Sequence, residues 1–452
     1  MAPALTRSHD REIVRLAVPA FLALVAEPLF LLADAAIVGH LGTEPLAGLG
    51  VAAVVLQTAV GLCVFLAYGT TASVARRLGA GDLRGALTQG IDGVWLAVLI
   101  GALVTIPGML FTEQLVGLFG ADASVAGPAA TYLRIAFLGT TPLLVMLATT
   151  GILRGLQDTR TPLFVAVAGN ALNVALNLML VYGVGPVEGL GLVGSAWGSV
   201  LAQIASAAAL LAVVVRAARR EGAGLAPDLP GIRAAAHAGV ALVIRTLTLR
   251  AALLLTTYAV TIGATGARDQ AVDLATHQLA LTVWTFLAFT LDAIAIAAQA
   301  ITGRYLGAGD VAGTREVTAR MVRWGLLSGV VTGLLLAAAS PLLGPLFTGD
   351  GDVHERLVPV LLVAALGQPV AGVVFVLDGV LIGAGDGTYL AWGGLATLAA
   401  YAPAVLASVA LGGGLLAVWV TFTVVFMGAR LVVLTRRARG DAWLRTGATA
   451  LR

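Results

Sequence analysis

Long apolar runs separated by short polar connections form the dominant pattern of this chain. A helix that crosses about 30 Å of hydrocarbon needs about 20 mainly apolar residues. Twelve runs reach that length, and the connections between them are too short to hold a soluble domain. We therefore predict twelve spanning helices. They cover residues 13–39, 46–75, 87–111, 127–153, 162–183, 190–216, 234–264, 274–303, 316–346, 357–383, 388–411 and 414–435.

The composition supports the same conclusion. Of the 452 residues, 59% are hydrophobic and only 11% are charged. A soluble globular chain carries about 25% charged residues, because it must cover its core with polar groups. A chain with less than half that share needs lipid as the solvent for most of its surface. We predict an all-α integral membrane protein.

The basic residues are distributed unevenly between the connections. All 27 of them are arginine, because the sequence contains no lysine. They gather at the amino terminus, in the even-numbered connections and in the tail, whereas the odd-numbered connections hold only Arg268 and Arg356. Arginine favours the cytoplasmic side of a membrane. We expect a multi-pass protein of the inner (plasma) membrane with both termini in the cytoplasm, and the net charge of +3 then reflects topology rather than nucleic-acid binding.

Several chemistries are excluded by residues that the sequence lacks. A phosphate-binding P-loop and a Schiff-base enzyme both need a lysine. Cys63 is the single cysteine, which excludes intrachain disulfides and cysteine-rich metal sites, and no HExxH zinc motif occurs. No Ser-His-Asp grouping stands out either. We expect a protein that is not an enzyme and that binds no metal or cofactor.

An internal repeat divides the chain into two halves. The pentapeptide LGAGD occurs at 78–82 and again at 306–310, an offset of 228 residues. Its glycines permit a tight reversal of the chain, and its aspartate can cap the helix that follows. Weaker matches at the same offset pair Leu118, Phe119, Gly155 and Asp158 with Leu346, Phe347, Gly383 and Asp386. One offset shared by three places indicates two related halves of six helices.

The repeat sets the domain boundaries that we expect. They are an N-terminal six-helix bundle at 1–216, a cytoplasmic linker at 217–232, a C-terminal six-helix bundle at 233–440 and a cytoplasmic tail at 441–452. Because six is even, both halves insert in the same orientation, related by a pseudo-two-fold axis along the membrane normal. Such halves face each other across a central cleft, an arrangement that suits a rocking transporter.

The first helix carries two acids, Glu27 and Asp34, seven residues apart on one helix face. Ionisable groups inside a span are expensive and are functional candidates by default. Pro19 and Pro28 remove backbone hydrogen bonds, so we expect this helix to bend. We assign proton coupling to Asp34 and Glu27. The structural alternative is that Asp34 is solvated near the outer interface or only hydrogen-bonds a neighbouring helix.

A stripe of amides follows the fifth helix. Asn170, Asn173 and Asn177 are spaced three and four residues apart, so they lie on one face. Amides of this kind often hydrogen-bond neighbouring helices in membranes, which is the structural interpretation. The functional interpretation, to which we give the same weight, is that these amides line a substrate cavity together with Asp34.

The second half holds further charged residues inside its predicted helices. Arg245 demands a partner, and Asp292 and Asp378 are both available. We favour a structural or gating ion pair for Arg245 over direct contact with a substrate. Asp292 and Gln299, seven residues apart, share a face that could line the cavity.

Aromatic side chains add two candidates for the substrate cavity. Tyr68 and Trp284 could stack on a flat cation, although packing in the core or at the interface is the more common use of either residue. Tyr68 and Trp284 complete the substrate-binding set. That set is Asn170, Asn173, Asn177, Tyr68, Trp284, Asp292, Gln299 and Asp378.

Several of these stretches resemble a known family. They are PLFLLADAAIVGHLGTEPLAGLG at 28–50, ILRGLQDTRTPL from Ile152 and LDGVLIGAGD at 377–386. Together they look like the multidrug and toxic compound extrusion (MATE) family. IRTLTLR at 244–250 and LDAIAIAAQA at 291–300 resemble its DinF-like branch. The resemblance covers essentially the whole chain and agrees with twelve helices in two bundles.

The resemblance implies secondary antiport, in which cationic or amphipathic drugs leave the cell as protons or sodium ions enter. In similar proteins an aspartate of the first helix accepts the proton, and Asp34 occupies that position. The family pattern in the fifth helix is an asparagine followed four residues later by an aspartate. Here Asn173 matches the asparagine, but Asn177 stands where the acid would be. Coupling must then rest on Asp34, with help from Glu27 or from acids of the second half.

We therefore predict a proton-coupled multidrug efflux antiporter that works by alternating access on small-molecule drugs or organic cations. We expect a monomer in contact with membrane lipid. A sodium-coupled antiporter is one alternative. Another is a flippase for lipid-linked precursors, which would want a basic cavity, whereas the in-span acids that we counted match or exceed the basic residues Arg134, Arg245 and Arg250.

Overall fold

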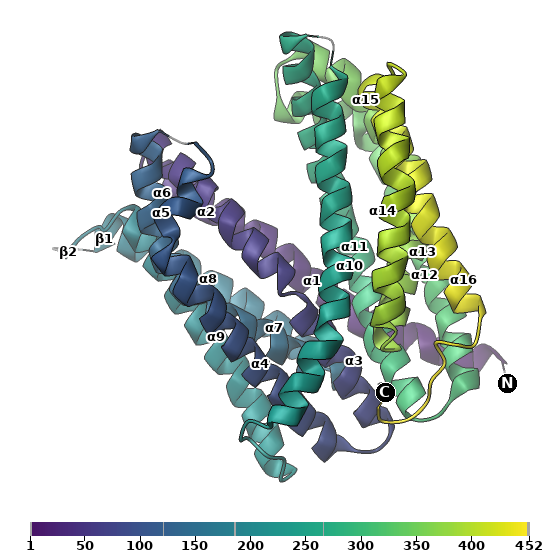
Figure 1. The fold of residues 1–452 in the computed structure, drawn as a ribbon. Helices are drawn as coiled ribbons and strands as arrows, with labels where there is room; N and C mark the ends of the chain where they lie inside the picture. The colour runs from purple at the N-terminus through teal and green to yellow at the C-terminus, as the bar shows by residue number, and fades with distance from the viewer. Residues whose placement is uncertain (1, 121, 185–186, 265, 450–452) are drawn as a thin grey trace. The chain divides into compact units, whose positions relative to one another are not determined.

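The structure is a computed structural model that describes residues 2–120, 122–184, 187–264 and 266–449 (Figure 1). Within these ranges, twelve helical segments are long and apolar enough to cross a membrane. They are His9–Gly39, Thr43–Gly79, Leu83–Leu110, Ala123–Gly155, Arg160–Tyr182, Leu192–Arg220, Leu229–Gly263, Ala267–Gly307, Val311–Phe347, Gly351–Gly383, Gly387–Ala410 and Gly414–Arg439. The all-α fold and all twelve predicted spans are confirmed.

Sixteen α-helices, two short helical turns of other types and one small hairpin make up the described chain. The elements are α1 (Ala2–Gly39), α2 (Thr43–Leu62), α3 (Phe65–Gly79), α4 (Leu83–Leu110), α5 (Thr112–Gly117), α6 (Ala123–Ala136), η1 (Phe137–Gly139), α7 (Thr140–Gly155), α8 (Arg160–Tyr182), β1 (Gly183–Val184), β2 (Val187–Glu188), α9 (Leu192–Arg220), α10 (Leu229–Gly263), α11 (Ala267–Gly307), α12 (Val311–Phe347), α13 (Gly351–Gly383), α14 (Gly387–Ala410), α15 (Gly414–Thr421), η2 (Phe422–Phe426) and α16 (Met427–Arg439). The strands β1 and β2 pair in antiparallel fashion.

Most helices are longer than the apolar runs that predicted them. The run 274–303, for example, lies inside α11, which extends to Gly307, and 316–346 lies inside α12, which begins at Val311. An apolar run marks the part of a helix in hydrocarbon, whereas backbone hydrogen bonding continues into the polar layer beyond it. Hydropathy therefore locates a helix well and its ends less well.

The chain forms two compact units, and two continuous helices pass from one unit into the other. One unit spans Val18–Gly239, and the other combines the residues up to Ala17 with Val240–Arg452. The divisions fall inside α1 and inside α10, whereas we expected bundles at 1–216 and 233–440. The expected linker 217–232 is also shorter in the structure, because α9 continues to Arg220 and α10 begins at Leu229.

Ion pairs explain why the first part of α1 groups with the second half of the chain. Asp10 accepts hydrogen bonds from Arg320 Nε at 2.6 Å and from Trp324 Nε1 at 2.8 Å, both on α12. Glu12 pairs with Arg304 of α11. These contacts join residues almost 300 positions or more apart, so no local pattern in the sequence announces them.

The two copies of the LGAGD pentapeptide form matching turns, as predicted. Gly81 and Gly309 have φ angles of 78° and 75°, a region that favours glycine. Asp82 then accepts a hydrogen bond from the Gly85 N–H at 2.8 Å, and Asp310 accepts one from Gly313 at 2.7 Å. The Gly85 bond is the main reason that the pKa of Asp82 lies below its usual range. Both aspartates are N-caps, of α4 and α12.

The second repeated turn differs between the halves. In the second half Gly385 has a φ of 73°, and Asp386 receives two hydrogen bonds from Arg437, from Nε at 2.6 Å and from a terminal nitrogen at 3.1 Å. In the first half Gln157 occupies the position of Gly385 and is the only non-glycine residue of the described chain with a positive φ, 66°. Asp158 holds this turn by accepting from the Thr161 N–H at 3.0 Å.

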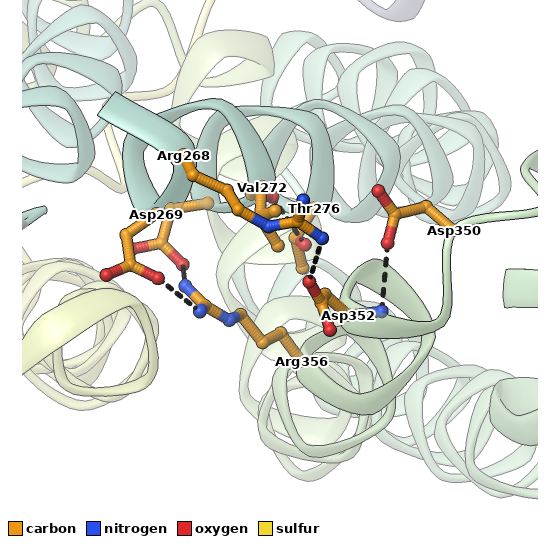
Figure 2. A network of polar contacts seen from close by, with 8 residues as sticks. Arg268, Asp269, Val272, Thr276, Asp350, Asp352 and Arg356 are labelled. Atoms are coloured by element: carbon orange, nitrogen blue, oxygen red, sulfur yellow. Dashed lines mark hydrogen bonds and ion pairs between the residues drawn. The ribbon is translucent and has the colours of Figure 1, made fainter. Parts of the chain in front are cut away.

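A polar network joins the first turns of α11 and α13 (Figure 2). Arg356 of α13 donates to Asp269 at 2.7 Å and to Asp273 at 2.6 Å, both on α11. In a further pair the arginine is on α11 and the acid on α13: Arg268 donates to Asp352 at 2.7 Å. Arg268 and Arg356 are the two arginines of the odd-numbered connections, where basic residues are otherwise absent, and each is paired with neighbouring acids.

Asp310 offers a test of the repeated turns, because its side chain caps α12 and makes no ion pair in the described chain. We expect Asp310→Ala to lower the free energy of unfolding by about 1 kcal/mol, whereas Asp310→Asn keeps the capping oxygen and loses much less. Thermal unfolding of the purified protein in detergent measures both. Equal losses in the two variants would show that the charge of Asp310 matters and that the cap does not.

Candidate functional site

Asp34, near the end of α1, lies at the centre of a buried polar cluster. Its side chain is 4% exposed. Oδ1 accepts hydrogen bonds from Asn177 Nδ2 of α8 at 2.6 Å and from Ser195 Oγ of α9 at 2.8 Å. Tyr132 of α6 directs its hydroxyl at Oδ2, at the longer distance of 3.5 Å. Three other helices of one unit therefore point donors at a single carboxylate.

The cluster continues from Asn177 toward the interior of the unit. Asn177 Nδ2 also donates to Asn173 Oδ1 at 3.1 Å, and Asn173 Nδ2 donates to Ser199 Oγ at 3.0 Å. Asn177 is fully buried, and its Oδ1 atom has no hydrogen-bond partner among the described residues. An amide oxygen buried in this way retains the capacity to accept a hydrogen bond.

Two glycines of α9 allow this helix to approach α8 closely enough to form the cluster. A Cβ atom at Gly194 would collide with the backbone of Leu180, and one at Gly198 would overlap Asn177 Oδ1. Small residues four apart are a common means of bringing membrane helices together. The spacing of Gly194 and Gly198 thus positions the Asn177 amide as well as the helix.

Sequence reasoning found part of this cluster and missed the rest. Asp34, Asn173 and Asn177 were expected to lie together, and the structure brings them together. Tyr132 and Ser195 were missed, because hydroxyl residues are common in membrane helices and nothing in their spacing distinguishes these two. The glycine pair that flanks Ser195 was the one available signal.

Two other candidates of the first half lie outside the cluster. Asn170 donates to the backbone oxygen of Ala26 at 2.8 Å, which joins α8 to α1. Glu27 is exposed and makes no hydrogen bond or ion pair within the part of the chain that the structure describes. The structure therefore does not bring Glu27 and Asp34 into contact, although they share a helix.

A second charged cluster lies in the other unit. Arg245 of α10 contacts both carboxylate oxygens of Asp378 of α13, with its Nε atom 3.4 Å from Oδ1. Arg430 of α16 approaches the same Oδ1 atom to 3.6 Å. The side chains are only 13%, 8% and 10% exposed. The ion pair expected for Arg245 is present, with Asp378 as its partner.

Arg430 was missed by sequence reasoning, as was a buried acid, Asp92. Both lie within predicted spans, 414–435 and 87–111, so the rule that flagged Asp34 applied to them equally. Asp92 of α4 is 4% exposed and lies beside Gly231 in the first turn of α10. We interpret Asp92 as a group that stabilises this helix start, because helix N-termini attract negative charge.

The remaining candidates are dispersed. The Trp284 ring lies edge-on to Phe422 at 5.4 Å, inside an aromatic cluster of its own unit. Gln299 is 2% exposed at the contact of α11 with α13, where its backbone faces Gly383. Tyr68 and Asp292 are half-buried on α3 and α11.

No cluster of three or more His, Cys, Asp or Glu side chains that could hold a metal ion occurs among the described residues. The two buried clusters described above are each built around one carboxylate, Asp34 or Asp378, with donors from other helices. In a membrane protein of twelve spans and two related halves, such groups define the class of a multi-pass membrane transporter.

The family follows from comparison with known proteins. The family model described as MatE matches residues 19–179 and again 247–403, one match in each unit. The chain belongs to the MatE family, a family of multidrug efflux transporters of small molecules. The double match also agrees with the repeat seen in the sequence.

Relatives from plants and bacteria share this family. Protein DETOXIFICATION 44, chloroplastic, of Arabidopsis thaliana is 31% identical over 84% of this chain and 73% of its own length. DNA damage-inducible protein F of Escherichia coli (strain K12) is 27% identical over 97% of this chain and 95% of its own. The probable multidrug resistance protein NorM of Thermotoga maritima is 24% identical over 83% and 80%.

Solved structures confirm the fold. An outward-facing multidrug resistance MATE family transporter of the MOP superfamily superposes with a TM-score of 0.86 at 22% identity, over 96% of both chains. A MATE protein in the bent conformation gives the same score at 22% identity, over 98% of this chain and 97% of that one. At this level of identity the likeness concerns the fold.

Gly198 provides a test of how the Asp34 cluster is built. We expect Gly198→Ala to lower the free energy of unfolding by about 1–3 kcal/mol, because the new methyl group must displace the buried Asn177 amide. Gly127→Ala on α6 is the matched control, since its methyl group meets no described atom within 4 Å. Thermal unfolding in detergent compares them. An unchanged unfolding temperature for Gly198→Ala would contradict the tight contact between α8 and α9.

Proposed function

We propose that this protein is a proton-coupled efflux antiporter that exports cationic or amphipathic small molecules by alternating access. It acts as a monomer in the inner (plasma) membrane, surrounded by lipid, with both termini in the cytoplasm and with no cofactor other than the proton gradient. The observation that carries the proposal is Asp34, a buried carboxylate that Asn177 and Ser195 hold by hydrogen bonds.

Two opposing effects make Asp34 suitable for loading and unloading a proton. Burial disfavours its charged form, whereas the hydrogen bonds from Asn177 and Ser195 stabilise that form. A carboxyl group balanced between these two effects gains or loses its proton when its surroundings change. A proton that arrives from outside then neutralises Asp34 and weakens its hold on a cation, and release of the proton to the cytoplasm restores the charge.

Asn177 is suited to respond to that change. With Asp34 ionised, its amide nitrogen donates to the carboxylate, and its oxygen has no partner among the described residues. A protonated Asp34 becomes a donor, and the amide oxygen can accept from it once the amide turns over. Asparagine thus follows the protonation of Asp34 without titrating itself.

The donors around Asp34 favour a proton over a sodium ion. A sodium ion needs several oxygen ligands, in the manner of other hard cations. The Asn177 atom nearest Asp34 is the donor nitrogen, and Ser195 also directs a hydrogen at the carboxylate. We therefore favour proton coupling and keep sodium coupling as the alternative that experiment must exclude.

A single carboxylate in the cluster also bears on stoichiometry. One proton exchanged for one monovalent cation moves no net charge, so only the pH gradient drives transport. A second proton would add the membrane potential, worth about 2.3 kcal/mol per charge per 100 mV. We expect electroneutral exchange of monovalent cations, because Asn177 supplies no second acid.

Transport by Asp34→Asn tests the proposal directly. In proteoliposomes that contain a fluorescent lipophilic cation, we expect an imposed pH gradient to drive transport by the wild-type protein. The Asp34→Asn variant should fall to the rate of protein-free liposomes, because its amide cannot carry a proton. A sodium gradient alone should drive transport by neither the wild-type protein nor the variant.

Glu27→Gln is the matched control, since it removes an acid of the same helix that lies outside the cluster. We expect it to retain pH-driven transport. If a sodium gradient alone drives transport by the wild-type protein, the protein is coupled to sodium and the proposal of proton coupling is wrong. Failure of both gradients with several cations, in protein shown to be folded, would contradict drug export.

A further inference from the structure

Arg430 is a buried arginine whose hydrogen-bonding capacity the described chain does not satisfy. A guanidinium group has five N–H donors and no acceptor. Its closest carboxylate oxygen, Asp378 Oδ1, lies 3.6 Å away, beyond the length of a normal N–H···O hydrogen bond. Its other contact is the Phe426 ring, 5.9 Å from the guanidinium carbon. A charge 10% exposed inside a span needs more than these two contacts.

Arg245 contacts both oxygens of Asp378, and Arg430 approaches one of them, Oδ1, only to 3.6 Å. Such two-point contacts between arginine and a carboxylate are the strongest of their kind. Arg430 therefore adds a second positive charge beside an ion pair that is already formed. Donors of Arg430 therefore remain available to an acceptor that the described chain does not supply.

A small cavity lies beside these donors. Its walls include Arg245, Thr248, Asp378, Thr397, Phe426 and Arg430, and its volume is about 20 Å³. The hydroxyls of Thr248 and Thr397 donate to carbonyls of their own helices, at 2.7 and 2.8 Å. The volume is enough for one group of about the size of a water molecule.

Two structural features keep this cavity open. Gly393 and Gly394 of α14 line it without a side chain, between Leu390 and Thr397 of the same helix, which also line it. The π-helical turn Phe422–Phe426 precedes α16 and interrupts its regular rotation one turn before Arg430. Turns of this type occur frequently at functional sites.

We propose that Arg430, assisted by Arg245, binds a small anionic group in this cavity of the second unit. A single halide ion, or one carboxylate oxygen of a larger acid, matches its charge and size. Its lining residues belong to one unit, and the Asp34 cluster belongs to the other. The site would let the protein accept an anion, or the acidic group of a cargo, in addition to a cation. This inference does not depend on proton coupling at Asp34.

Thermal unfolding of the purified full-length protein tests the site. The background salt is a bulky sulfonate at constant ionic strength, and chloride or acetate replaces it stepwise. We expect the unfolding temperature of wild type to rise saturably by at least about 2 °C, as a ligand specific to the folded state requires. A response to chloride identifies a free inorganic ion, and a response to acetate alone identifies a carboxylate.

Arg430→Gln should remove the response, whereas Arg439→Gln should retain it, because Arg439 is an exposed arginine of the same helix. Titration calorimetry of wild type with the same two anions supplies a readout that does not depend on folding of the variant. The proposal is overturned if neither anion binds saturably to wild type, or if Arg430→Gln responds as wild type does.

Discussion

The cost of an ionised group in hydrocarbon governs the polar organisation of this protein. Only a few charges lie deep in its spans, and two of the carboxylates, Asp34 and Asp378, are each surrounded by partners from other helices. Asp34 has amide and hydroxyl donors from other helices, and Asp378 has Arg245. Because these partners come from different helices, each charge also fixes how its helices pack.

The two units use this constraint in different ways. The unit that holds Asp34 surrounds one acid with neutral donors, so the carboxylate can change its charge without breaking an ion pair. The other unit opposes Asp378 with two arginines, an arrangement that holds its charges permanently. The repeat gave both halves related helices and the same LGAGD turn, yet their buried clusters differ in charge.

The long helices that cross between the units bear on how such chemistry can produce movement. α1 is held to the second half by Asp10 and Glu12 near its start and carries Asp34 near its end. Pro19 and Pro28 lie between these points and weaken the helix there. A change of charge at Asp34 therefore acts on a helix that is anchored in the other unit.

The sequence alone determined the twelve spans, the repeat and the capped turns, and it marked Asp34 and Asn177 as candidates, because each follows from composition or spacing along the chain. Only the tertiary structure decided that Ser195 and Tyr132 meet Asp34, that Asp378 is the partner of Arg245, and that the start of α1 joins the second half. Those contacts join residues about 100 to 300 positions apart. They depend on how each helix is rotated against its neighbours, and in a uniformly apolar environment hydropathy does not encode that rotation.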